Sequence, residues 1–134
     1  MPKKKTPGQL KKDLWKIFSQ FIRLRDSDEF GMVKCCTCDT RKPWKYMQAG
    51  HFIPKAKGNA IYFHEDNVHG QCQQCNVFKK GNLIEYYPWM LKKYGEVYVN
   101  ELRALAKTER KYKSYEYEEL IEHYKQLVAE LKNG

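Results

Sequence analysis

The fold of this chain is decided by three short sequences: CCTC at residues 35–38, AGHF at residues 49–52 and NVHGQCQQCN at residues 67–76. Cys35 with Cys38, and Cys72 with Cys75, form two C-x-x-C pairs with 33 residues between them. Each pair can present two thiolates from one tight turn, and two such turns complete a tetrahedral zinc site. The sequence therefore predicts a structural zinc ion that holds the two ends of this segment together.

Two other uses of paired cysteines have less support. Disulfides are typical of exported proteins, and no apolar segment follows the opening Met-Pro-Lys-Lys-Lys. A redox C-x-x-C motif needs only one pair. The fifth cysteine, Cys36, would form too short a knuckle with Cys38, so we expect it to be a packed thiol.

The segment between the pairs alternates as strands do. The alternating runs are Trp44–Met47, His51–Ile53 and Ala60–Phe63, with a turn at Lys57–Asn59. The polar run Asn76–Lys80 after the last cysteine is compatible with a helix. We expect two short strands, a loop and a helix, pinned by zinc.

These residues resemble the HNH nucleases, which share the ββα-metal motif, and among them the phage NinG (Rap) recombination endonucleases. The resemblance covers most of residues 10–131 and is carried by WKYMQAGHF at 44–52, EDNVHGQCQQCN at 65–76 and GN at 81–82. It implies an α+β fold in which N-terminal and C-terminal helices flank a zinc-stapled ββα-metal (HNH) core.

The resemblance also implies roles for three residues. His51 takes the position of the general base, and Asn67 that of the asparagine bracing the loop that holds the base. Asn76 takes the position of a ligand of the catalytic divalent ion, Mg²⁺ or Mn²⁺. Many relatives place Asp or His just before the base as a second ligand, but this chain has Gly50. We expect Gln48, His69 or Asp66 to take that place, or water to complete the ion's shell.

The chemistry of phosphodiester hydrolysis suits these residue types. Histidine titrates near neutral pH and can take a proton from the attacking water, while an amide oxygen holds a hard cation weakly and leaves it open to phosphate. Taken singly, His51 is more often an ordinary hydrogen-bonded histidine, Asn67 a turn residue and Asn76 a helix cap. Their combination with the zinc frame favours catalysis.

The charge of the chain points to nucleic acid. Its 134 residues carry a formal charge of +9, of which residues 1–25 contribute +7. A basic end favours polyanion binding, although a solvated tail that aids solubility is the alternative. We expect phosphate contacts near the site from Lys55, Lys57, Lys79 and Lys80. No run of 18 apolar residues exists, so we expect no membrane span.

The chain should form one compact unit, since 134 residues with 42% apolar content can bury one core. We divide it into a disordered basic tail at 1–8, a nuclease domain at 9–95 and a helical extension at 96–134. Apolar spacing predicts four helices: Gln9–Arg25, Leu83–Tyr94, Glu96–Lys107 and Ser114–Lys132. The apolar stripe of the last helix either makes a homodimer contact or folds back on the chain's own core.

The function we expect is that of a metal-dependent HNH endodeoxyribonuclease acting on branched recombination intermediates such as Holliday junctions and D-loops. The resemblance implies cuts that leave 5′-phosphate and 3′-hydroxyl ends, and a phage or prophage protein in the cytoplasm of a bacterial host. Two alternatives stay open: an HNH nuclease that nicks ordinary duplex DNA, and a non-catalytic zinc-stapled DNA-binding module.

Overall fold

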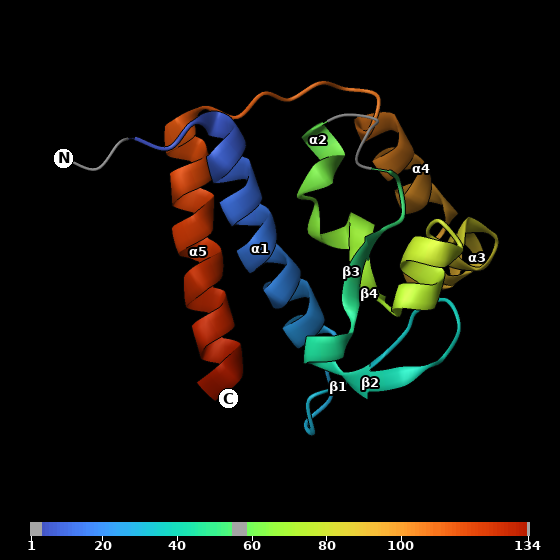
Figure 1. Cartoon of the computed structure of the whole chain (residues 1–134). Helices are drawn as coiled ribbons and strands as arrows, with labels where there is room; N and C mark the ends of the chain where they lie inside the picture. Colours follow the sequence, from blue (N-terminus) through green and yellow to red (C-terminus); the bar gives the residue numbers. More distant parts are fainter. Residues whose placement is uncertain (1–3, 55–58, 134) are drawn as a thin grey trace.

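The computed structural model describes residues 4–54 and 59–133. Its elements combine helices with two separate two-stranded antiparallel sheets (Figure 1). The expected α+β class is therefore confirmed. Within the described residues no helix is long and apolar enough to cross a membrane.

The first helix, α1, spans Pro7–Arg25 and so begins two residues earlier than predicted. Thr6 caps it: its hydroxyl accepts the Gln9 backbone N–H at 3.2 Å, and the Gln9 side chain accepts the Thr6 backbone N–H at 2.9 Å. This reciprocal capping, with proline at the first position, starts the helix inside the stretch that we had assigned to a disordered tail. Residues 1–3 lie outside the described part.

The last helix, α5, spans Ser114–Asn133 and lies beside α1 (Figure 1). Tyr124 packs its ring edge-on against Phe18, with centroids 5.0 Å apart, and its hydroxyl donates to Glu65 Oε2 at 2.9 Å. Tyr117, Ile121, Tyr124 and Val128 are buried in the same cluster as the apolar face of α1. We had expected the apolar stripe of this helix either to make a homodimer contact or to pack on the chain's own core, and in the structure it packs on that core.

The first sheet is a hairpin of β1 (Met32–Lys34) and β2 (Arg41–Pro43), with Lys34 opposite Arg41. The loop at the end of this hairpin carries the first cysteine pair.

The second sheet pairs β3 (Gln48–His51) with β4 (Val68–Gln71), placing Gly50 opposite His69. All three predicted strand runs need correction: of His51–Ile53 only His51 lies in a strand, and the other two runs are not strands. Trp44–Tyr46 forms the 3₁₀ turn η1, and Asn59–Tyr62 forms the short helix α2. A second 3₁₀ turn, η3 (Glu65–Asn67), leads into β4. Neither run has the alternating burial of a strand: no side chain of η1 is buried, whereas Ile61, Tyr62 and Phe63 are buried one after another.

A single π-helical turn, η4 (Gln74–Phe78), follows β4 at the position where we predicted a helix from Asn76. Beyond it lie α3 (Leu83–Tyr94) and α4 (Glu96–Leu105), separated by Gly95 at φ 86°. These helices form a second core with Phe52 and Ile61 of the loop between β3 and β4. The π-turn and α3 therefore cover the second sheet on the side away from α5 (Figure 1).

Candidate active site and cysteine centre

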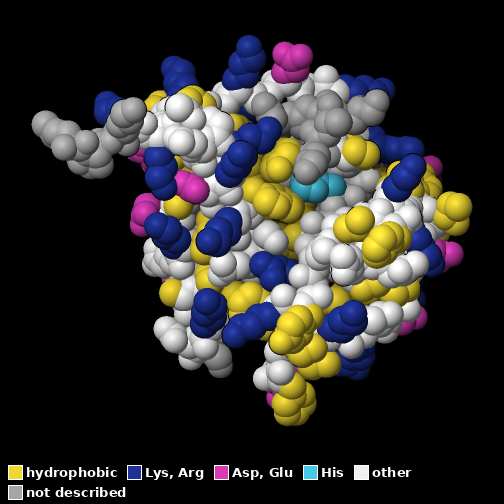
Figure 2. Space-filling model, viewed as in Figure 1, with side chains coloured by type: hydrophobic (Ala, Val, Ile, Leu, Met, Phe, Trp, Pro, Cys, Tyr) yellow, Lys and Arg dark blue, Asp and Glu magenta, His cyan; other side chains and the backbone are white. Residues whose placement is uncertain are grey.

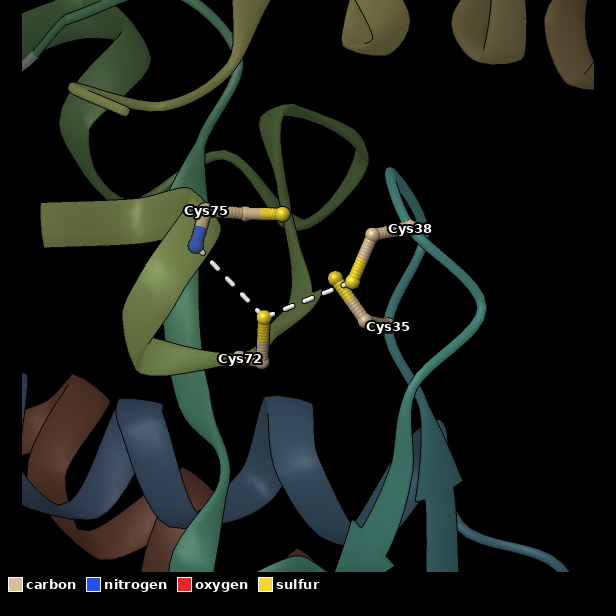
Figure 3. Close-up of side chains that lie close together, drawn as sticks. All are labelled: Cys35, Cys38, Cys72 and Cys75. Carbon is tan, nitrogen blue, oxygen red and sulfur yellow. Dashed lines mark hydrogen bonds between the residues drawn. The ribbon is translucent and has the colours of Figure 1, made fainter. Parts of the chain in front are cut away.

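Four cysteine side chains converge between the two sheets (Figure 3). Cys35 and Cys38 come from the loop after β1, whereas Cys72 directly follows β4 and Cys75 lies in η4. Their four Sγ atoms lie within 4.8 Å of one another, and Sγ of Cys38 is 3.5 Å from Sγ of Cys72. None of the chain's five cysteines, all of them in the described ranges, forms a disulfide. Four thiols at these separations fit the donor set of a structural zinc ion.

Polar groups surround these sulfurs. Thr37 Oγ1 lies 3.4 Å from Cys35 Sγ, and Thr40 Oγ1 lies 3.1 Å from Cys38 Sγ. Asn82 donates its Nδ2–H to Cys75 Sγ at 3.5 Å. Such contacts stabilise thiolates and orient ligands in metal centres.

Cys36 stays apart from this centre, as expected. Its side chain packs on the core that contains Tyr86, and its backbone N–H donates to the Gly70 carbonyl at 3.1 Å. Burial raises the pKa of the Cys36 thiol well above its usual range. Cys36 is also not one of the four convergent sulfurs, which agrees with its role as a packed side chain.

A cleft of about 570 Å³ lies beside the cysteine centre, between α1, β3 and the segment that joins η4 to α3. His51 and Asn76 both line it, together with Gln48. Asn76 directly follows Cys75, which is one of the four convergent cysteines. The cleft and the cysteine centre therefore share one stretch of backbone. The structure thus brings the predicted base and the predicted ion ligand to one cavity.

His51 ends β3 and is held by two neighbours. Its ring stacks on Trp15 of α1, with centroids 4.9 Å apart and planes 20° apart. Its Nε2 lies 3.0 Å from the Tyr62 carbonyl, which can only accept. That contact is a hydrogen bond when Nε2 carries the proton, so in the neutral ring the basic lone pair is on Nδ1. Sequence reasoning missed Trp15, although it lies one turn beyond Lys11 at the margin of the apolar face.

Asn67 is fully buried and ties the chain that follows His51 to β4. Its Oδ1 accepts the Ile53 backbone N–H at 2.8 Å, and its Nδ2 donates to the carbonyls of Ile53 and Ile61 at 3.1 and 3.3 Å. The backbone carbonyl of Asn67 also accepts from Phe52 N–H at 2.8 Å. This geometry is that of a brace for the loop beyond His51.

Asn76 is half-buried, and its amide orientation is set by Gln48. Its Nδ2 donates to Gln48 Oε1 at 2.7 Å. The Asn76 Oδ1 atom therefore faces Gly50, 3.1 Å from the point that a Cβ on residue 50 would occupy. A second oxygen, Oε1 of Gln71, lies only 1.8 Å from the same point.

The residues we had expected to replace the missing ligand at position 50 are engaged elsewhere. Both ring nitrogens of His69 contact tyrosine hydroxyls, at 2.9 Å to Tyr86 and 2.8 Å to Tyr94. Burial, reinforced by the charges of Arg25 and Lys93, lowers the pKa of His69 to about 2, so it is neutral. Asp66 accepts a hydrogen bond from the Tyr98 hydroxyl. Gln48 lines the cleft but its oxygen holds Asn76.

Basic side chains surround the cleft (Figure 2). Lys80 and Arg23 line it directly, and Lys79 is exposed beside Lys80. Arg23 is anchored by its Nε–H, which donates to the Ser19 carbonyl at 3.1 Å. The other two predicted phosphate contacts, Lys55 and Lys57, lie outside the described residues.

The fold and site define a small mixed α+β protein with a four-cysteine centre next to a polar cleft. The chain belongs to the NinG family, because the family profile described as "Bacteriophage Lambda NinG protein" matches residues 2–134. The NinG membership expected from the sequence is thereby confirmed.

Curated relatives agree with this assignment. The chain is 31% identical over 114 residues to "Protein ninG" of Salmonella phage P22 and to that of Escherichia phage lambda. Each match covers 85% of this chain and 53% of the relative. "Protein ninG" of Enterobacteria phage H19B is 33% identical over 84 residues, which are 63% of this chain and 39% of that protein. The chain thus spans about half the length of the curated relatives that it matches. No solved structure matches it.

Proposed function

We propose that this chain is a metal-dependent DNA endonuclease of the HNH, ββα-metal class. The observation that carries the proposal is the shared cleft, in which His51 and Asn76 meet beside the cysteine centre. The order of elements also fits, since the paired strands β3 and β4 are followed directly by the helical turn that holds Asn76.

In this proposal His51 acts as the general base. The Tyr62 carbonyl holds the proton on Nε2 and the stacked Trp15 fixes the ring plane, so Nδ1 can take the proton of an attacking water. Asn67 keeps the following loop in place, which preserves the position of the histidine relative to the cleft.

Asn76 Oδ1 is the residue oxygen offered to a divalent cation. When bound, Mg²⁺ or Mn²⁺ would neutralise charge on the phosphate and on the leaving 3′ oxygen. Arg23 and Lys80 line the same cleft and can position the phosphodiester backbone by charge, which fixes register and does not read bases. Zinc in the cysteine centre has the separate task of holding β1, β4 and η4 together.

We further propose that the substrate is a branched recombination intermediate. This choice rests on the NinG resemblance. Two alternative functions are nicking of ordinary duplex DNA and binding of DNA without cleavage. The missing side chain at Gly50 would favour the second, because it removes a metal ligand.

One experiment separates the three. A labelled four-way junction and a linear duplex of matched sequence are incubated with zinc-loaded protein, with Mg²⁺, with Mn²⁺ and with neither. Cleavage of the junction alone, only with a divalent ion, supports the proposal. Equal nicking of both substrates favours the duplex nuclease, and binding without cleavage under all conditions would leave a DNA-binding module.

A further inference from the structure

We propose that Oε1 of Gln71 is the second protein ligand of the divalent-ion site, together with Oδ1 of Asn76 and in place of the side chain that Gly50 lacks. The inference rests on the proposed function and deepens it by naming the ligand set. Three features of the described residues lead to it.

The first feature is an unsatisfied oxygen. Gln71 is fully buried, and its Nε2 donates to Thr37 Oγ1 at 3.1 Å and to the Gly81 carbonyl at 2.9 Å. Because a carbonyl can only accept, this pair of contacts fixes which end of the amide is nitrogen. Among buried side-chain nitrogen and oxygen atoms of the described residues, Gln71 Oε1 alone lacks a hydrogen-bond partner. A buried oxygen in this state destabilises the fold, because it has given up its hydrogen bonds to water without gaining one in the protein.

The second feature is the cradle at Gly50. A Cβ at residue 50 would lie 1.8 Å from Gln71 Oε1, far inside contact distance, so Gln71 occupies the space of the missing side chain. The glycine is required at this position because any larger residue would displace that amide.

The third feature is the convergence of two oxygens. Asn76 Oδ1 lies 3.1 Å from the same Cβ position, and Gln48 holds the nitrogen end of that amide. Amide oxygens are hard ligands that suit Mg²⁺ and Mn²⁺. Two neutral ligands would leave the ion its full charge and most of its water shell, and hence open to phosphate. Gly50 then marks an exchange of ligands and not a lost site.

The direct test uses the unaltered, zinc-loaded protein. Side-chain carboxamide ¹³C resonances are followed by NMR while Mg²⁺ is added, with the exposed Gln73 as reference. We expect the carbons of Gln71 and Asn76 to shift together along one binding curve while Gln73 stays still. A shift of Asn76 without Gln71 would overturn this inference and leave the nuclease proposal standing. No shift of either would count against both.

Variants test the same assignment through Mn²⁺ affinity, read from the electron paramagnetic resonance signal of free Mn²⁺. Gln71→Met keeps the volume but removes the oxygen, and Gln73→Met is the matched control. We expect Gln71→Met to weaken binding at least about tenfold, which is the lower end of what even outer-shell partners of a metal contribute. The control should bind as the unaltered protein does, and equal affinity in both variants would refute the assignment.

Exchange of the ligand supplies a second variant test that does not depend on Gln71→Met folding well. Gly50→Asp alone collides with Gln71, so it should lose Mn²⁺ binding. Gly50→Asp with Gln71→Ala makes room for a carboxylate at the same point and should restore it. Zinc content and thermal melting are measured for each variant. Binding that is lost equally in the single and double variants, with zinc retained, would contradict the exchange.

Discussion

His51 is held more tightly than a solvent-exposed histidine, by the Trp15 ring on one side and the Tyr62 carbonyl at its Nε2. Such support is what a general base requires, because proton transfer depends on the direction of the lone pair as well as on the pKa.

Replacement of this ring gives the prediction at the residue scale. His51→Ala should lower the cleavage rate about 10²–10⁴-fold, the usual contribution of a general base. Affinity for DNA should stay nearly unchanged, since it depends on lysine and arginine charges. Single-turnover cleavage and filter binding measure the two quantities. His123→Ala, on the exposed side of α5, is the control and should cut normally. Near-normal cutting by His51→Ala would show that another group is the base.

Several individual residues of the site could be predicted from the sequence. His51 and Asn76 do meet in one cleft, and Asn67 does brace the loop beyond His51. Gln71 could not be foreseen, because its importance depends on which atom of its amide is left without a partner. Thr37 and Gly81 accept the hydrogen bonds of the Gln71 nitrogen and so leave its oxygen without a partner. Thr37 lies far from Gln71 in the sequence, and Gly81 lies beyond the π-turn.

At the scale of elements, the cysteine centre replaces the hydrophobic core that such short strands cannot build. β1 and β2 have three residues each, and β3 and β4 have four. Strands of this length are marginal by themselves. Binding of a metal ion by the four thiolates would supply the missing folding free energy.

Zinc analysis follows from this. The folded protein should contain one equivalent of zinc, and a chelator should lower its melting temperature and release β1–η4 from the rest. Cys72→Ala should lose the zinc, whereas Cys36→Ala should keep it, because only Cys72 belongs to the convergent sulfurs. Elemental analysis of both variants is the measurement. Less than about half an equivalent in well-folded unaltered protein would argue against a four-thiolate site.

The strand β4 was not predicted from the sequence. β4 carries His69, Gly70 and Gln71, whose side chains or backbone are all buried, so it lacks the alternation by which strands are recognised. Its polar groups are paired by distant elements, as when Asp26 accepts the Gly70 backbone N–H at 2.8 Å. By contrast the long helices α1, α3 and α5 follow their apolar spacing closely, since each packs one face only.

The α1–α5 pair provides the second prediction at this scale. Ile121→Ala should lower the free energy of unfolding by about 2–5 kcal/mol, because the residue is buried between the two helices of one chain. Leu131→Ala, on the same helix but 42% exposed, should cost far less. Denaturant unfolding at several protein concentrations is the measurement. A midpoint that rises with concentration would reveal a contact between copies that the buried stripe does not predict.

Over the whole molecule, positive charge is concentrated in α1 and around the cleft, whereas residues 96–134 have a net charge of −1. Figure 2 shows Lys and Arg side chains over the face formed by α1 and the cleft. This uneven distribution gives a polyanion one preferred approach, which leads to the proposed site.

Salt dependence of DNA binding tests that approach. Replacing Lys79 and Lys80 with Gln should reduce the slope of log K against log salt by about 0.9 for each phosphate of duplex DNA that the variant no longer neutralises. Lys92→Gln with Lys125→Gln, on α3 and α5 away from the cleft, removes the same charge as a control. An equal change of slope in both pairs would mean that the protein binds through its overall charge and not through the cleft.

Cys75 and Asn76 are joined by a single peptide bond, yet one faces the cysteine centre and the other the cleft. On the proposed function, two ions of different chemistry would thus be held by adjacent residues of one π-helical turn. Any effect that binding at one centre has on the other would then be matched by an equal effect in return, as reciprocity of coupled equilibria requires. Through that coupling, loss of zinc would change the affinity of this chain for Mg²⁺, and the proposed nuclease would respond to a metal that takes no part in its chemistry.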